Sequence, residues 1–299
     1  MGIRVHLVDG TYELFRHYYA LPEHVTADGR EVSATRGVVG SVLALLEDGA
    51  THVGVATDHV VESFRNDLWD GYKTGEGIDP DLWSQFGPLE DALDAAGVTV
   101  WPMVEFEADD GLAAGAAVAD ATPEVDTVLI CTPDKDLAQC VRGDRVVQFD
   151  RRNNRIDDAH GVRERFGVDP PSIPDYLALV GDSADGFPGL PGWGAKSAST
   201  VLAEYGHLEA IPRLGEDWSV QVRGARRLAA TLADQMGDAE AFRNLARLRT
   251  DVAADVEIGS VESWRWNGPR EDFAEVAASL DAPGLAERAH ALAATLTAP

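Results

Sequence analysis

The hydrophobic positions of the chain form short runs in the first half and a helical periodicity in the second half. Runs of aliphatic and β-branched residues alternate with amphipathic stretches, which is the pattern of strands that alternate with helices. We predict strands at 3–8, 52–57, 98–104 and 126–131, a further apolar run at 145–149, and helices at 12–20, 34–48, 81–96 and 109–120. This alternation favours an α/β fold with a mostly parallel central sheet that is flanked by helices.

From about residue 157 onward the strand pattern stops, and helical patterns continue to the end of the chain. We therefore predict two regions, an α/β domain over residues 1–165 and a helical region over residues 166–299.

The composition limits the environment in which the protein works. The chain has 299 residues with 25 Lys and Arg against 51 Asp and Glu, a formal charge of −26. Taken alone, this charge argues against a partner as negative as DNA. No apolar run is long enough to span a bilayer, and the N-terminus does not resemble a signal peptide. The two cysteines, Cys131 and Cys140, show no metal-binding or disulfide spacing. We expect a cytoplasmic protein that does not bind membranes.

Acidic residues follow the ends of the predicted strands. In a parallel sheet the carboxyl ends of the strands lie along one edge, where open α/β proteins bind ligands. We therefore expect seven carboxylates to converge, namely Asp9, Asp58, Glu107, Asp109, Asp110, Asp134 and Asp136. Capping of a helix N-terminus explains one or two acids, but not four within 105–110.

Such a cluster requires either raised pKa values or bound cations. Carboxylate oxygens without sulfur or imidazole ligands are suited to Mg²⁺ or Mn²⁺. Two such ions about 4 Å apart can clamp the attacking and leaving oxygens of a phosphoryl transfer. The acids therefore predict a metal site.

Two further stretches each allow a functional and a structural interpretation. In 181–199, Asp182 and Asp185 are spaced so that they can share one face of a helix, and a Gly-rich turn follows them. That turn lacks the contiguous Gly-Lys-Ser of a P-loop. It is either a binding site for a backbone phosphate or a tight turn that needs Gly for its conformation. The stretch 63–77 combines basic and aromatic residues, which suit nucleic-acid contact, or it is a surface loop with its Trp anchored in the core.

Taken together, these stretches resemble the 5′-nuclease family, the flap endonucleases and the 5′→3′ exonuclease domain of bacterial DNA polymerase I. The resemblance extends from residue 3 to about 250 and depends on the motifs VDG, SFRxxxxxGYK, EADD, TPDKDL, GDSAD and GLPGWGAKSA. It implies a PIN-like or resolvase-like α/β fold, followed by a helix–hairpin–helix element that grips duplex DNA, with K⁺ at the hairpin. No polymerase domain follows, so the chain resembles a stand-alone nuclease.

The resemblance also implies roles for individual residues. One metal would be bound by Asp9, Asp58, Glu107 and Asp109, and the other by Asp134, Asp136 and Asp185, with Asp110 and Asp182 in support. Lys73 and Arg65 would contact the scissile phosphate, with Arg16 near it. We expect the DNA-binding residues to be Tyr72, Gly189, Gly192, Gly194, Lys196, Ser197, Arg223, Arg226 and Arg227, with Arg243, Arg247 and Arg249 in the same basic region.

The chain departs from the family pattern at two positions. Glu76 stands where the bacterial family usually has Arg, and Gly186 stands where it commonly has Asn. The first change weakens the expected grip on a single strand, and neither change removes a predicted metal ligand.

The leading interpretation is a Mg²⁺-dependent nuclease with two ions, for which Mn²⁺ can substitute. It would act as a monomer on DNA with a 5′ flap, a 5′ end or a nick, in replication or repair. A structure-specific DNA-binding protein with little catalysis is one alternative, and a small-molecule phosphohydrolase is another. The sequence leaves open the preference for exonuclease or endonuclease cleavage, RNA or DNA in the 5′ strand, and the replication partner.

Overall fold

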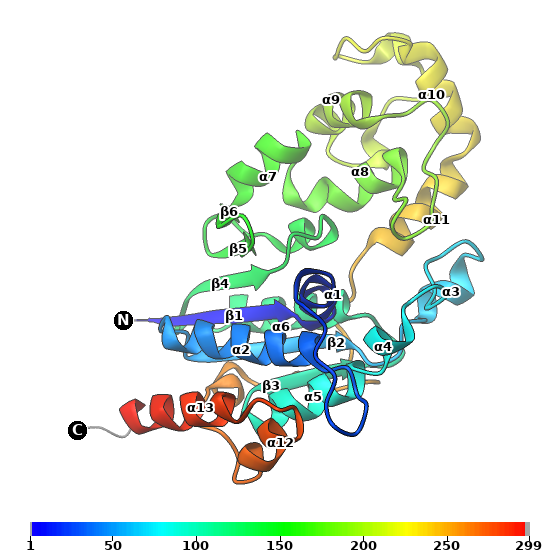
Figure 1. The fold of residues 1–299 in the computed structure, drawn as a ribbon. Coiled ribbons are helices and arrows are strands. Elements are labelled where there is room, and N and C mark those ends of the chain that lie inside the picture. Colours follow the sequence, from blue (N-terminus) through cyan, green and yellow to red (C-terminus); the bar gives the residue numbers. More distant parts are fainter. Residues whose placement is uncertain (1, 297–299) are drawn as a thin grey trace. The chain divides into compact units, whose positions relative to one another are not determined.

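The computed structural model describes residues 2–296, which form two compact units (Figure 1). The first unit contains the chain up to Val61, Gly75–Thr132 and the residues from Arg249 onward, and the second contains Glu62–Thr74 and Pro133–Leu248. The chain leaves the first unit twice and returns to it twice, so these spatial units are not continuous in sequence, unlike the two regions predicted on either side of 165/166. Within residues 2–296, no helix has both the length and the apolar character needed to cross a membrane.

Four parallel strands form the sheet of the first unit, in the order β3-β2-β1-β4. They are β1 (Ile3–Asp9), β2 (His52–Asp58), β3 (Thr99–Met103) and β4 (Val125–Cys131), which confirms the four predicted strands. Their apolar runs are continuous because helices cover both faces, and Val5, Leu7 and Val8 of β1 are fully buried.

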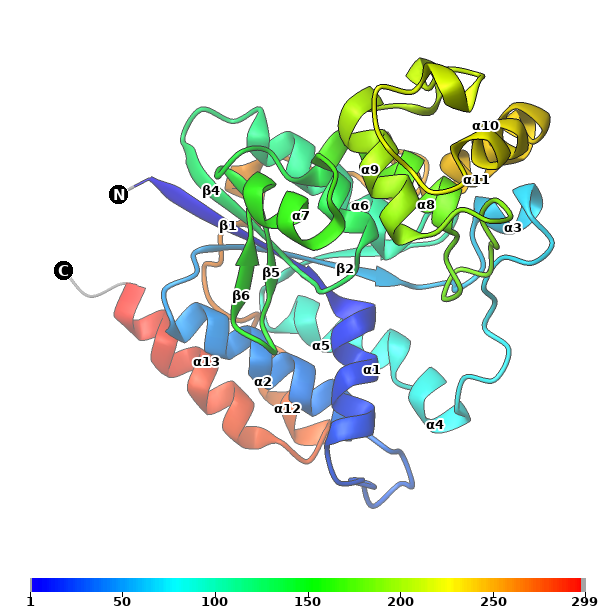
Figure 2. The same ribbon diagram turned by 90° about the horizontal axis from the view of Figure 1, so that it is seen from above.

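The helices of the first unit are divided between the two faces of this sheet. They are α1 (Gly10–Ala20), α2 (Ser33–Glu47), α4 (Pro80–Trp83), α5 (Phe86–Ala95), α6 (Ala108–Asp120), α12 (Phe273–Ser279) and α13 (Pro283–Leu296). Figure 2 shows α6 on one face and α2, α5 and α13 on the other. The chain runs from β1 to β2 to β3 and then turns back past β1 to β4, so right-handed crossovers require this division. The reversal creates a switch point at the carboxyl ends of β1 and β4, where open α/β sheets bind ligands.

Helix α6 is rich in Ala and Gly because it packs very closely on the sheet. A Cβ atom added to Gly115 would lie 2.9 Å from the Trp101 ring, and one added to Gly111 would lie 3.1 Å from the Met103 sulfur. Trp101 in turn packs edge-on against Trp264, with 5.3 Å between the ring centroids. Small residues therefore let the N-terminus of α6 approach the ends of the strands.

The second unit is mainly helical, as predicted. It contains α3 (Phe64–Leu68), α7 (Ala159–Phe166), α8 (Ile173–Val180), α9 (Ala195–Tyr205), α10 (Ala225–Asp234) and α11 (Met236–Ala246). The predicted run at 145–149 forms β5 (Val146–Asp150), which pairs with the antiparallel β6 (Arg155–Asp157). Strand β6 was not predicted, because it has three residues and Ile156 is exposed. Leu177, Val201 and Phe242 belong to the core of this unit.

A buried ion pair joins α8 to α11 in the second unit. Asp175 is 1% exposed, and its carboxylate accepts a hydrogen bond from Arg243 at 3.0 Å. Arg243 also donates to Glu209, and this bond lowers the pKa of Glu209 to about 2. Arg243 therefore holds the fold together, which separates it from the exposed arginines of the predicted basic region.

Replacement of Arg243 by Ala should destabilise the protein, because it leaves the Asp175 carboxylate buried without its main cationic partner. We expect the free energy of unfolding to fall by about 3 kcal/mol, measured by urea denaturation at neutral pH. The Glu209 contribution should be complete above its ordinary pKa of 4.5 and be lost as the pH falls to about 2. The exposed Arg223→Ala serves as the control, and equal losses in the two variants would contradict this role.

Candidate metal centre and nucleic-acid interface

Asp9 and Asp58 lie at the carboxyl ends of the neighbouring parallel strands β1 and β2. Asp9 ends β1, is 6% exposed, and accepts hydrogen bonds from the Tyr12 N–H at 2.8 Å and the Thr132 hydroxyl at 2.9 Å. Asp58 ends β2, and its N–H donates to the Thr11 hydroxyl at 2.8 Å. The start of α1 thus connects the two strand ends, and both carboxylates lie at the sheet edge.

The loop before α6 joins the same site. Asp58 accepts a hydrogen bond from the Ala108 N–H at 2.8 Å, and the neighbouring Glu107 is 3% exposed. Asp110 is fully buried, and its two carboxylate oxygens accept the N–H groups of Arg249 at 2.7 Å and Glu107 at 3.0 Å. Because main-chain donors occupy both oxygens, Asp110 shapes the loop, in keeping with the predicted supporting role. Asp109 is half-buried on the first turn of α6.

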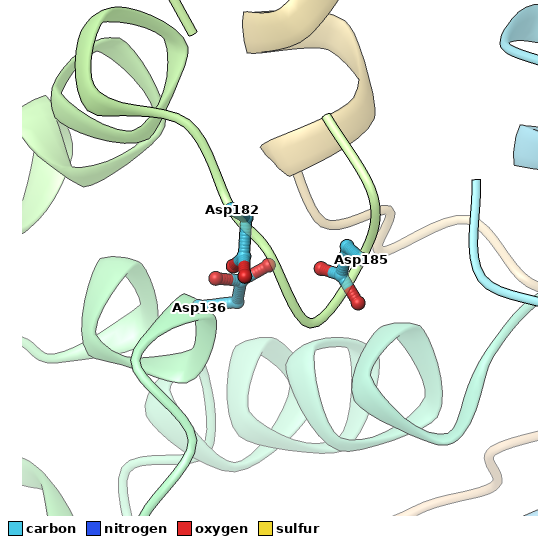
Figure 3. Close-up of side chains that lie close together, drawn as sticks. All are labelled: Asp136, Asp182 and Asp185. Carbon is cyan, nitrogen blue, oxygen red and sulfur yellow. The ribbon is translucent and has the colours of Figure 1, made fainter. Parts of the chain in front are cut away.

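A second acidic cluster lies in the second unit, where Asp136, Asp182 and Asp185 point toward one another (Figure 3). One ligand atom from each residue lies within 4.8 Å of the others. Asp136 begins a short 3₁₀ helix, and the other two belong to the turn that follows α8. Asp134 accepts the Asp136 N–H at 2.9 Å and is therefore next to this cluster. Asp182, predicted only in support, is a full member of the cluster.

The cluster strongly disfavours an isolated negative charge on Asp136. This residue is 5% exposed, and its Oδ1 atom is buried without a hydrogen-bond partner. Burial, together with the charges of Asp134, Asp185 and Asp182, raises the pKa of Asp136 well above its ordinary value. A cation beside Oδ1 would remove both penalties.

Two lysines partly neutralise this cluster. Lys73 Nζ lies 3.2 Å from Asp185 Oδ1, and Lys135 Nζ lies 2.6 Å from Asp182 Oδ2. Although burial opposes the charged form, the hydrogen bond to Asp182 and the neighbouring carboxylates raise the pKa of Lys135. No site role was predicted for Lys135 from the sequence, although the rarity of lysine was a signal, because the chain has only three lysines.

The donor set fits a hard divalent cation. The clustered ligand atoms are all carboxylate oxygens, two of the three acids are at least nine-tenths buried, and one oxygen lacks a protein donor. This is the chemistry that Mg²⁺ and Mn²⁺ prefer.

The segment Glu62–Thr74 packs within the second unit and places Lys73 at the cluster. Arg65 is 1% exposed and donates to the carbonyls of Leu245 at 2.8 Å and Arg247 at 3.2 Å, at the C-terminal end of α11. Such a helix end attracts a cation. The predicted contact between Arg65 and a phosphate does not fit this burial, so Arg65 is an anchor of the segment.

The aromatic residues of this segment also belong to the fold. Tyr72 is 4% exposed in the core of the second unit, so the predicted contact between its ring and DNA does not fit the structure. Trp69 packs edge-on against Phe242 and donates to the carbonyl of Gly186 at 3.1 Å. The Lys73 N–H donates to the Asp185 carbonyl at 3.1 Å, which ties the lysine to the acidic turn.

Gly186, one of the two departures from the family pattern, has a structural reason. Its φ is +84°, and a Cβ atom would lie 1.9 Å from the carbonyl oxygen of Gly71. Only Gly fits this approach between the acidic turn and the segment that carries Lys73.

The Gly-rich turn between α8 and α9 forms an exposed hairpin. Gly192 has φ +84°, and a Cβ atom there would lie 3.6 Å from the Arg227 guanidinium, whereas Gly194 faces open space. Lys196 is exposed and Ser197 is half-buried on the first turn of α9. Gly189 is buried, and a Cβ atom there would lie 2.3 Å from the Gly181 nitrogen, so Gly189 serves the backbone instead of the surface.

The remaining predicted basic residues differ in their surroundings. Arg223 is exposed, and Arg226 is paired with Glu216 at 3.0 Å on the surface. Arg16, in the first unit, is 27% exposed and pairs with Glu13 on the same helix. Arg227 lies beside the hairpin, which makes it the arginine with the clearest relation to that surface.

Comparison with known proteins assigns the family. Residues 4–167 match the family described as "5'-3' exonuclease, N-terminal resolvase-like domain", and residues 168–272 match "5'-3' exonuclease, C-terminal SAM fold". Both matches are to domains of nucleases, so the class of protein is a nuclease. The chain belongs to the 5′–3′ exonuclease family.

Similar proteins extend this assignment. DNA polymerase I of Rhizobium leguminosarum is 34% identical over 279 residues, which cover 90% of this chain and 27% of the relative. The thermostable DNA polymerase I of Thermus aquaticus is 33% identical over 260 residues, which cover 85% and 30%. The chain therefore spans less than a third of the length of these relatives.

Two solved structures share the fold. The T5 D15 protein co-crystallised with metal ions has a TM-score of 0.66 at 17% identity, with 93% of this chain and 99% of that chain covered. The catalytic core of Rad2 in complex with DNA substrate has a TM-score of 0.62 at 16% identity, with 99% and 93% covered. These likenesses confirm the predicted fold class.

The second cluster should make stability depend on divalent metal. We expect Mn²⁺ at a hundredfold excess over its Kd to stabilise the wild type by about 2.7 kcal/mol relative to chelator, which is a rise of several degrees in Tm. Asp136→Asn should be more stable than the wild type in chelator and gain less from Mn²⁺, because it removes a buried carboxylate from among other acids.

The control is Asp144→Asn, which changes an exposed acid of the same unit. Thermal scans at constant ionic strength measure all three proteins. Equal metal-induced shifts in Asp136→Asn and Asp144→Asn would mean that the ions act on the general acidic surface.

Proposed function

We propose that this protein is a Mg²⁺-dependent 5′ nuclease that hydrolyses phosphodiester bonds near 5′ ends, nicks or 5′ flaps of DNA. The observation that carries the proposal is the cluster of Asp136, Asp182 and Asp185, with its unpartnered buried oxygen and Lys73 beside it. Family membership supports the reaction class. The Rad2 core described above was solved with a DNA substrate, which supports DNA as the substrate class.

The carboxylates divide into two ligand groups, one in each unit. Asp9, Asp58, Glu107 and Asp109 of the first unit would hold one ion, with Asp110 as the organiser of their loop. Asp136, Asp182 and Asp185 of the second unit would hold the other, with Asp134 next to them. When bound, such ions activate water and stabilise charge on the phosphoryl oxygens.

Lys73 supplies positive charge that does not depend on metal. Asp185 and the main chain around it fix the position of the ammonium group, and Arg65 fixes the segment that carries it. We propose that Lys73 exchanges its Asp185 contact for the phosphate at the reacting bond, where its charge opposes the negative charge that develops during attack.

The hairpin provides a grip on duplex backbone that is separate from hydrolysis. The exposed Gly192, Gly194 and Lys196 leave room for a phosphate close to the main chain at the start of α9. Arg227 adds a second positive charge beside Gly192. A strongly acidic protein would thus bind DNA through a small local surface instead of through its net charge. A K⁺ ion at the hairpin, monomeric action and a role in replication or repair are part of the same proposal.

Incubation with Mg²⁺ and a duplex that carries a labelled 5′ flap tests this function. The wild type should cleave near the flap base, and chelator should abolish cleavage. Asp136→Asn should reduce turnover by at least about 100-fold, whereas binding to the flap DNA should change by less than about tenfold, because the phosphate donors lie elsewhere. Asp144→Asn should behave as the wild type.

The other outcomes identify the alternatives. Binding of flap DNA by the wild type without metal-dependent cleavage would indicate a structure-specific binding protein. Hydrolysis of small phosphate esters without cleavage of any DNA would indicate a small-molecule phosphohydrolase.

The hairpin should control affinity for duplex DNA. Lys196→Ala and Arg227→Ala should each weaken duplex binding and reduce the salt dependence of binding by about one phosphate contact. Turnover of a short single strand should stay close to that of the wild type. Arg270→Ala, an exposed arginine of the first unit that is paired with Asp94, is the control. An equal loss of single-strand turnover in Lys196→Ala would contradict a separate grip.

A further inference from the structure

Asp255 is far in sequence from the predicted motifs, yet it contacts the loop that carries the acids of the first unit. Its carboxylate accepts hydrogen bonds from three successive N–H groups, those of Val104 at 2.9 Å, Glu105 at 2.9 Å and Phe106 at 2.8 Å. Both carboxylate oxygens take part in these bonds. The loop starts directly after β3 and leads into Glu107, so Asp255 holds the main chain immediately before a predicted metal ligand.

The residues just before Asp255 contact the same loop from a second side. The Arg249 N–H donates to Asp110 at 2.7 Å, and Asp110 in turn accepts the Glu107 N–H. Val252 between them is buried, and its carbonyl accepts the N–H of Asp255, which fixes the turn that carries this carboxylate. Residues 249–255 thus hold the acidic loop at Val104–Phe106 and at Asp110.

The loop that Asp255 contacts is rich in acids. Asp255 adds a carboxylate at the main chain of Glu105, and Glu107 and Asp109 follow directly in the sequence. Val104 is 49% exposed. Without Asp255, the N–H groups of residues 104–106 would hydrogen-bond to water, and the main chain of the loop would not be held in one conformation. Charge-assisted bonds from three converging N–H groups are strong enough to define one path.

We propose that Asp255 is a positioning residue that fixes the main chain of residues 104–107 so that Glu107 and Asp109 are presented together to a divalent ion. This inference depends on the proposed metal-binding role of those two acids. Residues that orient metal ligands commonly have this positioning role. Their removal weakens metal affinity by about 10–100-fold.

The matched variants are Asp255→Asn, which keeps the shape and removes the charge, and Asp251→Asn, an exposed acid four residues earlier. Hydrogen exchange in the presence of chelator provides a readout that does not require activity. In Asp255→Asn the amides of Val104, Glu105 and Phe106 should exchange at least about tenfold faster than in the wild type, because they lose charge-assisted acceptors. Asp251→Asn should leave their exchange unchanged.

Mn²⁺ binding then tests the link to the ligands. Calorimetry in an Asp136→Asn background reports on the first unit, because the second cluster is disabled. Addition of Asp255→Asn should weaken the remaining binding by about 10–100-fold, whereas Asp251→Asn should change it by less than about twofold. In the otherwise wild-type protein, Asp255→Asn should require more Mg²⁺ for half-maximal cleavage of flap DNA and recover most of its turnover at saturating Mg²⁺.

A merely structural role would lower Tm without changing the metal concentration for half-maximal cleavage, and that result would overturn the proposal. Unchanged exchange at residues 104–106 would overturn it as well. If Asp255→Asn does not fold, Asp255→Ser, which keeps one acceptor oxygen, replaces it and should show the same directions of change. If Asp255→Ser has the same amide exchange and the same Mn²⁺ affinity as the wild type, the proposal is refuted. A wild type that binds no Mn²⁺ in the first unit and cleaves no DNA would instead refute the proposed function, while the exchange result would still report on the loop.

Discussion

Repulsion among closely spaced carboxylates is the constraint on which the two acidic sites depend. Asp9, Asp110, Asp136 and Asp182 are each at most 6% exposed, so water cannot screen their charges. A buried carboxylate is tolerated only when hydrogen-bond donors, cations or protons compensate its charge. The surroundings of both sites follow from this requirement.

The two units meet the requirement in different ways. In the first unit the main chain supplies the donors, through the N–H groups of Tyr12, Ala108 and Arg249. In the second unit two of the chain's three lysines pair with Asp182 and Asp185, and one oxygen of Asp136 stays without a donor. The first arrangement fixes the ligands before metal arrives, whereas the second leaves a gap in the compensation that a divalent ion can fill. A nuclease needs both properties, because its ligands must be ordered and its ions must bind.

The features that the sequence predicted well depend on local pattern or on sheet topology. Asp9 and Asp58 were located from the strands that precede them, because the end of a parallel strand determines the edge on which its last side chain lies. The helical character of the second half was confirmed for the same reason, since its periodicity is local. The exposed hairpin around Gly192 and Lys196 also lies where the Gly-rich turn predicted it.

The features that were missed depend on packing between distant segments. Tyr72 and Arg65 have the residue types of a nucleic-acid surface. However, Tyr72 lies in the core of the second unit, and Arg65 donates to the carbonyl of Leu245 in α11, 180 residues later. Asp255 belongs to no motif, and only the folded chain brings it to Val104. The two compact units are also not visible in the local pattern, because α8 and α11 contribute to the core of the second unit before the chain returns to the first unit at Arg249.

We propose above that Asp136, Asp182 and Asp185 form a divalent metal site. Anomalous diffraction from crystals soaked in millimolar Mn²⁺ tests it most directly. We expect an anomalous peak in contact with Asp136 Oδ1, the oxygen without a protein donor, and a lengthening of at least one of the Lys73–Asp185 and Lys135–Asp182 contacts. A map that shows Mn²⁺ elsewhere on the acidic surface, with no peak at these three carboxylates and both lysine contacts intact, would contradict it.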